Sequence, residues 1–246
     1  MELSGRVALV TGGKRIGSVV AVEMARQGAD IGLCYNRSRA ETEKTAASIE
    51  AIGRKVFVKQ ADLMRAADCE GFVNESASAL GRVDVLVNMA SIYAGRPFSE
   101  LTVDAFDQSV AVDLRSAFIC SRAAVPHMRK AGGGRIINFS DWLSKSGRPR
   151  YTGYLPYYVA KTAVIGLTEA LALELAPDRI LVNAIAPGPI LAPTETTDEE
   201  LAAVEKSTPL GQWGGEQAIA DAVLALLNLD FVTGETIRVD GGRHLR

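Results

Sequence analysis

Short apolar runs alternate with longer amphipathic stretches along the whole chain. The runs are rich in Val and Ile and apolar on both faces, as in strands buried inside a parallel sheet; they span residues 7–10, 31–35, 56–58, 83–87, 135–139, 180–185 and 236–239. The stretches between them have helical periodicity, notably residues 18–27, 40–52, 104–130, 157–176 and 217–229. This alternation predicts right-handed crossovers and a doubly wound sheet. Residues 1–246 are therefore expected to form one α/β domain, with seven parallel strands and helices on both faces.

Two segments interrupt this alternation. Residues 140–156 are polar, contain Gly and Pro, and are predicted to form a long loop after the fifth run. Residues 187–200 hold three prolines after the sixth run and lead into an expected lid over residues 191–206. Both segments follow strands, so they leave the carboxyl edge of the sheet, where open α/β folds place their ligands. Long loops at this edge are typical of functional segments.

Composition narrows the class of protein. The chain has 48% hydrophobic and 23% charged residues and a net charge of −2, which favours a globular fold and argues against general nucleic-acid binding. Cys34, Cys69 and Cys120 are too few and too scattered for a disulfide framework or a zinc site, so a reduced compartment and no metal are expected. Neither a signal peptide nor a run of about 18 apolar residues is present, which predicts a cytoplasmic protein without a membrane span.

The stretch TGGKRIG, residues 11–17, joins a predicted strand to a predicted helix, the context of a nucleotide-binding loop. Gly12 and Gly13 would let the backbone approach a pyrophosphate, and Gly17 would let the helix pack tightly on the strand. The N-terminus of the helix then offers free N–H groups and a positive dipole end. For the glycines alone, an ordinary turn is an equal alternative.

The end of the second predicted strand indicates which nucleotide is bound. An NAD site normally places an acid here for the adenosine ribose, but this chain has Asn36, Arg37 and Ser38. A guanidinium and a hydroxyl suit a 2′-phosphate, which an acid would repel. Lys14 and Arg15 are predicted to serve the same cofactor's phosphates. The sequence therefore predicts NADPH, with a solvated surface charge as the alternative for Arg37.

Tyr157 and Lys161 are four residues apart and so share one face of a predicted helix, which Pro156 would start. A nearby ammonium favours phenolate and should lower the pKa of the tyrosine. Tyr157 would then donate a proton to a substrate that receives a hydride. This short pattern is common by chance and is weak when taken alone.

Taken together, these motifs resemble the short-chain dehydrogenase/reductase family, a Rossmann fold, over nearly the whole chain. The resemblance implies that Thr11, Gly12 and Ile16 belong to the cofactor loop and that Lys161 binds the nicotinamide ribose. Other positions implied to lie along the cofactor are Asp62 and Leu63 at the adenine, Asn88 and Ala90 beyond it, and Pro187, Gly188 and Ile190 at the carboxamide. The same resemblance implies a homotetramer built on the helices over residues 104–130 and 157–176, with the C-terminal strand at another contact.

Three departures from the family pattern are informative. Asp141, in the stretch NFSD, stands where the catalytic serine usually lies, and Asp113 replaces the usual asparagine of the proton relay. The glycine loop is one residue short and has Arg15 in place of a glycine. Asp141 is therefore predicted to be catalytic with Tyr157 and Lys161. The alternative is that Asp141 only caps the loop while Ser140 or Ser144 does the work of a serine.

These departures resemble the pteridine reductases and the bacterial dihydromonapterin/dihydrofolate reductases of this family. That likeness implies that Arg15 faces both a phosphate and a pterin, that Ser91 hydrogen-bonds the pterin, and that Tyr93 stacks on it. Packing at the edge of the core is the alternative for Tyr93. The predicted function is NADPH-dependent reduction of a pterin-like C=N heterocycle, a small-molecule substrate. A carbonyl reductase, such as a 3-oxoacyl-thioester reductase, and a non-catalytic NADPH-binding regulator are the alternatives.

Overall fold

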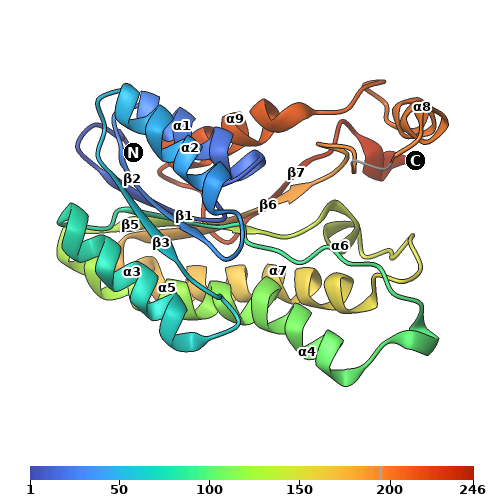
Figure 1. Ribbon diagram of the computed structural model, residues 1–246, viewed down its shortest axis with the longest axis horizontal. Helices are drawn as coiled ribbons and strands as arrows, with labels where there is room; N and C mark the ends of the chain where they lie inside the picture. The colour runs from blue at the N-terminus through green and yellow to red at the C-terminus, as the bar shows by residue number, and fades with distance from the viewer. Residues whose placement is uncertain (194–195) are drawn as a thin grey trace.

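A computed structural model describes residues 1–193 and 196–246. Within these residues seven parallel strands form one sheet in the order β3-β2-β1-β4-β5-β6-β7 (Figure 1). The strands are β1 (Val7–Thr11), β2 (Asp30–Tyr35), β3 (Val56–Gln60), β4 (Val85–Asn88), β5 (Gly134–Phe139), β6 (Ile180–Pro187) and β7 (Thr236–Val239). The chain reverses direction across the sheet between β1 and β4, where neighbouring crossovers lie on opposite faces. This arrangement confirms the predicted doubly wound Rossmann fold.

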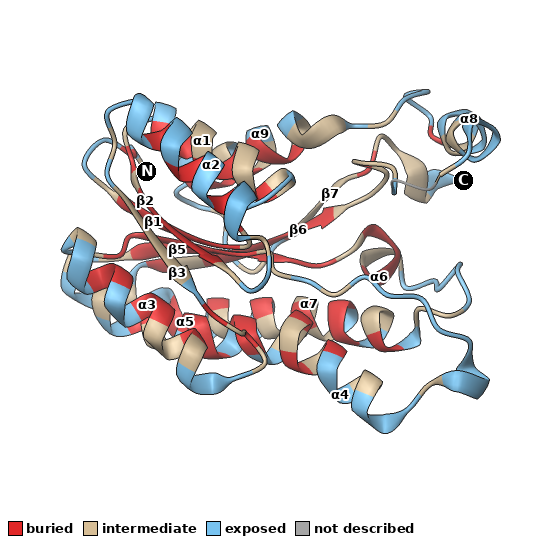
Figure 2. Ribbon diagram, viewed as in Figure 1, coloured by how far each residue is buried: buried red, intermediate tan, exposed pale blue. Residues whose placement is uncertain are grey.

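Helices cover both faces of the sheet (Figure 1). One face carries α1 (Ile16–Arg26), α2 (Arg39–Ala51) and α9 (Gly215–Asn228), and the other carries α3 (Ala66–Leu80), α4 (Val103–Val110), α5 (Ser116–Ala131) and α7 (Leu155–Leu175). Each face has its own hydrophobic core, so the central strands are buried on both sides (Figure 2). Two-sided burial explains why these strands are continuous apolar runs rather than alternating ones.

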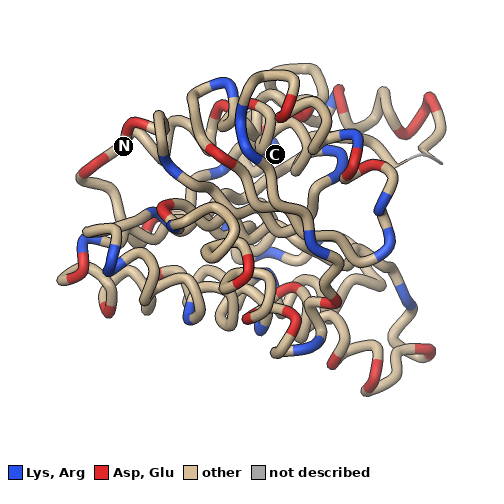
Figure 3. The backbone as a smooth tube through the Cα atoms, turned by 60° about the vertical axis from the view of Figure 1, so that its left-hand side comes forward, with Lys and Arg blue, Asp and Glu red and all other residues tan. Residues whose placement is uncertain are grey.

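The charged residues lie mainly on the outside, where both signs are interspersed (Figure 3). Among the described residues, no helix is long and apolar enough to cross a bilayer. All three cysteines are buried and free, and all three belong to the core between the sheet and α3 and α5. The sequence suggested scattered cysteines, but the fold brings them into one cluster.

Three local elements differ from the predictions. The single helix expected over residues 104–130 is divided by a π-helical turn, η2 (Ala111–Arg115), which widens the helix locally at Asp113. The loop expected over residues 140–156 contains a short helix, α6 (Trp142–Ser146), because Asp141 caps its first turn. In the expected lid, α8 (Asp198–Ser207) begins at Thr197 with a capping box, while residues 194–195 of that lid lie outside the described residues.

Candidate active site

The turn between β1 and α1 requires glycine at three positions. A Cβ on Gly17 would lie 1.8 Å from the carbonyl oxygen of Gly12, and Gly12 itself has a φ of +99°. Gly17 therefore packs the helix against the end of the strand, as predicted. Gly13 has a different reason to be glycine, because a Cβ there would lie 2.8 Å from Cγ2 of Thr42 on α2.

The cations of this turn face solvent at the N-terminus of α1. Lys14 and Arg15 are exposed, and neither side chain pairs with a carboxylate among the described residues. The backbone N–H groups of Lys14 and Arg15 likewise donate no hydrogen bond to any residue that the structure describes. Arg15 has a φ of +51°, a conformation that costs a non-glycine residue energy and that clusters at functional sites. Free N–H groups, two cations and a helix N-terminus together fit a phosphate.

The second strand and the third meet beside this turn. Asn36, exposed after β2, donates from Nδ2 to Oδ1 of Asp62 at 3.4 Å, and Asp62 also accepts from the N–H of Met64 at 3.1 Å. Arg37 is exposed and has no ion pair among the residues described, and Ser38 is the N-cap of α2. The structure thus brings the predicted adenosine-side residues together and leaves a free guanidinium beside them.

Thr11 ties the ends of β1 and β4 together. Its Oγ1 accepts from the N–H groups of Met89 at 2.9 Å and Ala90 at 3.1 Å. The amide of Asn88 points into the protein and donates to Oδ1 of Asn138 at 2.9 Å. Asn88 would therefore act on the cofactor only by holding the end of β4 in place, because its side chain belongs to a buried hydrogen-bond network between β4 and β5.

The end of β6 is equally constrained. A Cβ on Gly188 would lie 2.4 Å from Cβ of Asp240, and Gly188 donates its N–H to the carbonyl of Val239 at 2.9 Å. Pro187 closes the strand, while Ile190 is buried in the core. Leu63, expected at the adenine, is buried too. These residues hold the backbone at the carboxyl edge in place.

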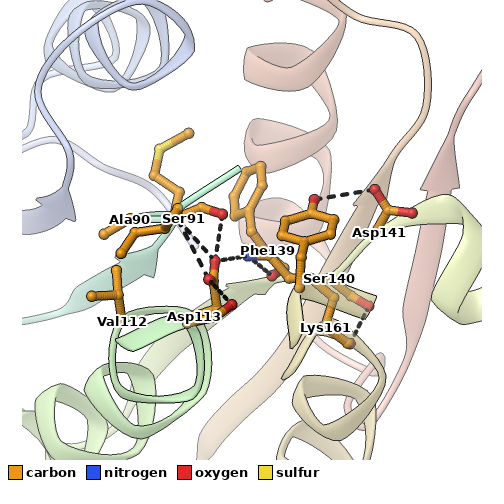
Figure 4. A network of polar contacts seen from close by, with 12 residues as sticks. Ala90, Ser91, Val112, Asp113, Phe139, Ser140, Asp141 and Lys161 are labelled. Carbon is orange, nitrogen blue, oxygen red and sulfur yellow. Dashed lines mark hydrogen bonds and ion pairs between the residues drawn. The ribbon is translucent and has the colours of Figure 1, made fainter. Parts of the chain in front are cut away.

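Tyr157 and Asp141, both predicted to be catalytic, are in direct contact (Figure 4). The phenol of Tyr157 donates to Oδ2 of Asp141 at 3.1 Å, while Oδ1 of Asp141 accepts from the N–H of Leu143 at 2.8 Å. Asp141 therefore both caps α6 and holds the phenol. The two candidate serines face elsewhere, because Ser140 donates to the carbonyl of Lys161 at 2.8 Å and Ser144 to that of Tyr158 at 3.5 Å.

Lys161 is anchored on the other side of Tyr157. Its Nζ donates to the carbonyl of Phe139 at 3.0 Å and lies 3.4 Å from Oδ1 of Asp113. It is 5.6 Å from the centre of the Tyr157 ring. An ammonium has three N–H donors, so one remains for a ligand, in agreement with the expected contact to a ribose.

The pKa of Tyr157 corrects one prediction. Burial raises it well above the usual value, and the carboxylates of Asp141 and Asp113 raise it further. The expected lowering by Lys161 is wrong for this structure, because burial of the phenol, followed by the charges of Asp141 and Asp113, sets the direction of the shift. Burial also raises the pKa of Asp141, although bonds from Leu143 and Tyr157 oppose the shift. Both groups therefore keep their protons to higher pH than usual.

Aromatic rings form one wall of the site. Tyr93 stacks on Tyr154 with ring centres 4.5 Å apart and meets Tyr157 edge-on at 4.9 Å. Tyr93 is 57% exposed, which argues against the alternative of packing at the edge of the core. The sequence did not single out Tyr154, although an aromatic residue three positions before Tyr157 was an available signal.

Asp113 joins this site from η2. It is buried and accepts from the hydroxyl of Ser91, so the residue expected to bind a pterin is held by a carboxylate (Figure 4). The change from the family's usual asparagine was visible in the sequence, but these contacts were not. The whole arrangement can bind a dinucleotide along the carboxyl edge and deliver a proton from Tyr157 beside it.

Comparisons with known proteins agree with this geometry. A family model described as enoyl-(acyl carrier protein) reductase matches residues 12–244. A short-chain dehydrogenase/reductase of Armillaria gallica is 35% identical, over 97% of this chain and 95% of its own. The 3-oxoacyl-acyl-carrier-protein reductase FabG of Staphylococcus aureus is 34% identical, over 97% of this chain and 98% of its own.

A solved structure extends the likeness to the fold. A short-chain dehydrogenase of Burkholderia cenocepacia, in complex with NADP, superimposes with a TM-score of 0.92 and 31% identity, covering 99% of each chain. These similar proteins support the family, whereas membership of the pterin-reducing subgroup is a proposal. The chain therefore belongs to the short-chain dehydrogenase/reductase family of oxidoreductases, as predicted, and has that family's site for a nicotinamide cofactor.

Proposed function

We propose that this enzyme uses NADPH to reduce a pterin-like C=N heterocycle, such as a dihydropterin or dihydrofolate. The observation that carries the proposal is the contact between the phenol of Tyr157 and the carboxyl group of Asp141. In the usual family pattern a serine hydroxyl donates a hydrogen bond to a carbonyl from this position. Here the side chain at this position accepts a hydrogen bond from Tyr157 instead, so the reaction it supports is one that needs a proton relay through that phenol.

NADPH fits the residues at the carboxyl edge. The turn at Lys14 and Arg15 suits the pyrophosphate, and Arg37 with Ser38 suits a 2′-phosphate because the end of β2 itself carries no acid to repel it. The free N–H of Lys161 suits the ribose. When bound, NADPH supplies a hydride to the carbon of the C=N bond.

Tyr157 provides the proton that balances this hydride. Its O–H bond breaks as an N–H bond forms on the ring nitrogen, and Asp141 returns a proton to the phenolate. Asp141 is then reprotonated from water. The raised pKa of Asp141 suits this role, because the carboxyl group holds its proton closer to neutral pH than an exposed aspartate does. The net change is addition of one hydride and one proton across C=N.

The walls of the site suit a flat ring. Tyr93 is exposed beside Tyr157 and braced by Tyr154, so its face is available to stack on a heteroaromatic substrate. Arg15 extends from the cofactor turn and is available to an electron-rich ring. Ser91, exposed in the segment that follows β4, has the position of a hydrogen-bonding partner.

Reduction of a 3-oxoacyl thioester is the second candidate, and the similarity to FabG favours it. Against it, neither Ser140 nor Ser144 turns its hydroxyl towards Tyr157. A non-catalytic NADPH-binding regulator is disfavoured as well, because such a protein needs neither Tyr157 nor Lys161.

A turnover screen tests the proposal. Purified protein with NADPH is assayed against dihydropterins, dihydrofolate, 3-oxoacyl thioesters and simple ketones, following loss of NADPH absorbance, with Tyr157→Phe as the inactive control. We expect turnover of at least one reduced pterin. Turnover of thioesters or ketones alone would establish the carbonyl reductase instead.

A further inference from the structure

Asp113 lies at the bottom of the site with its carboxylate surrounded by donors. Oδ2 accepts from the hydroxyl of Ser109 at 3.1 Å, and Oδ1 accepts from the N–H of Ile92 at 3.3 Å and from the hydroxyl of Ser91. The ammonium of Lys161 lies 3.4 Å from Oδ1, and both charged side chains are almost fully buried. Figure 4 shows these contacts converging on one side chain.

The donors fix the direction of the bond to Ser91. Lys161, the Ile92 N–H and Ser109 together stabilise Asp113 as a carboxylate, and an ionised carboxylate only accepts hydrogen bonds. The hydroxyl of Ser91 must therefore donate its single hydrogen to Asp113. Ser91 is itself exposed, so the side of its oxygen that faces the site presents lone pairs only.

We propose that Asp113 is a positioning residue that makes Ser91 an obligate hydrogen-bond acceptor, so that the site selects substrates carrying an N–H donor. The chemical class is a heterocyclic lactam or amine N–H, as in the pyrimidinone ring of a pterin. A substrate that offers only a carbonyl oxygen to Ser91 would place its own lone pairs against those of the serine oxygen, and no hydrogen bond could form. The inference rests on the proposed function, because it assumes that the ligand lies beside Tyr157.

An asparagine at this position would not impose the same direction. Its amide group can present either an oxygen or an NH₂ to Ser91, and in the second case the serine hydroxyl is free to donate to a carbonyl. Asp113→Asn should therefore relax the discrimination with little change in shape. This substitution also restores the residue usual in the family.

The test measures binding and turnover of matched probes in the presence of NADPH. The probes are 7,8-dihydropterin and its derivatives methylated at the lactam nitrogen or dimethylated at the exocyclic amine, which remove one donor at a time. We expect wild type to bind one derivative roughly tenfold to a hundredfold more weakly than the parent, as for a buried polar group left unpaired. In Asp113→Asn and in Ser91→Ala this ratio should fall to within about threefold, because the serine oxygen no longer demands a donor and the unpaired-group penalty is lost.

Ser109→Ala is the matched control, because it removes another buried donor to Asp113 and leaves the contact between Asp113 and Ser91 in place. It should keep the wild-type ratio. A purely structural role of Asp113 would weaken all probes equally and leave the ratio unchanged in Asp113→Asn, which would overturn the inference.

The outcomes separate this inference from the proposed function. Discrimination without turnover would support the N–H selectivity and refute pterin reduction. Turnover without discrimination in wild type would refute the selectivity alone. Failure of wild type to bind or reduce any of these probes would overturn both.

Discussion

Replacement of Asp141 by serine separates its two structural roles. Serine is also a good N-cap, so Asp141→Ser should keep α6 (Trp142–Ser146) intact, whereas Asp141→Ala should cost about 0.5–2 kcal/mol of stability through the lost cap. Both variants lose the carboxyl group that accepts from Tyr157 at 3.1 Å. General acid–base help of this kind is worth roughly 10²–10⁴-fold in rate, or about 2.7–5.4 kcal/mol of transition-state free energy.

The assay is steady-state kinetics of wild type, Asp141→Ser and Asp141→Ala with a dihydropterin and with a ketone. We expect kcat for the dihydropterin to fall by roughly 10²–10⁴-fold in both variants. NADPH affinity should barely change, because Asp141 lies away from the phosphate-binding turn. Asp141→Ser should retain or improve any ketone turnover. If Asp141→Ser reduces the dihydropterin as fast as wild type, Asp141 is only a helix cap and the carbonyl-reductase hypothesis becomes the better one.

Three further predictions follow from the charges and surfaces described above. NADPH should bind more tightly than NADH, and Arg37→Asp should remove about 1.5–3 kcal/mol of that preference; nucleotide fluorescence titration checks this against Arg39→Asp, whose wild-type side chain pairs with Glu43. The rate of reduction should fall as pH rises through the raised pKa of Asp141, because the carboxyl group loses the proton it relays, and this limb should be absent from the pH–rate profile of Asp141→Asn. Light scattering should show a homotetramer that Leu173→Arg dissociates, since this leucine is 80% exposed on α7 (Leu155–Leu175), and a wild-type monomer at micromolar concentration would refute it.

The sheet was predictable because strands that are buried on both faces have a recognisable hydrophobic pattern in the sequence. Each central strand is a continuous apolar run, and the position of each strand between helices fixes the class of fold. The capping box of Thr197 and Glu200 at α8 (Asp198–Ser207) was also available as a local signal, although the prolines before it suggested a loop. Most of the fold could therefore be predicted from local sequence patterns.

The site was less predictable, because its decisive contacts join distant segments. The spacing of Tyr157 and Lys161 is a property of the local sequence, so it was enough to predict that both residues share one face of a helix. The pKa of Tyr157 is set by its burial and by the charges of Asp141 and Asp113, which only the folded structure brings together, so the sequence predicted the wrong direction for it. The direction in which Ser144 points depends on α6, a short helix that Asp141 caps and that the sequence pattern did not predict.

The distribution of charge around Tyr157 bears on the choice between the two candidate reactions. Two acidic side chains, Asp141 and Asp113, flank the phenol, while the ammonium of Lys161 lies 3.4 Å from Asp113 and 5.6 Å from the centre of the phenol ring. Reduction of a carbonyl builds negative charge on oxygen, which the carboxylate of Asp113, and that of Asp141 once it has passed its proton to Tyr157, would oppose in a poorly solvated site. Protonation of a C=N nitrogen builds positive charge, which the same carboxylates would stabilise. A protonated C=N group also accepts a hydride more readily than a neutral one. The charges therefore favour a nitrogen heterocycle for the same reason that they keep the proton on Tyr157.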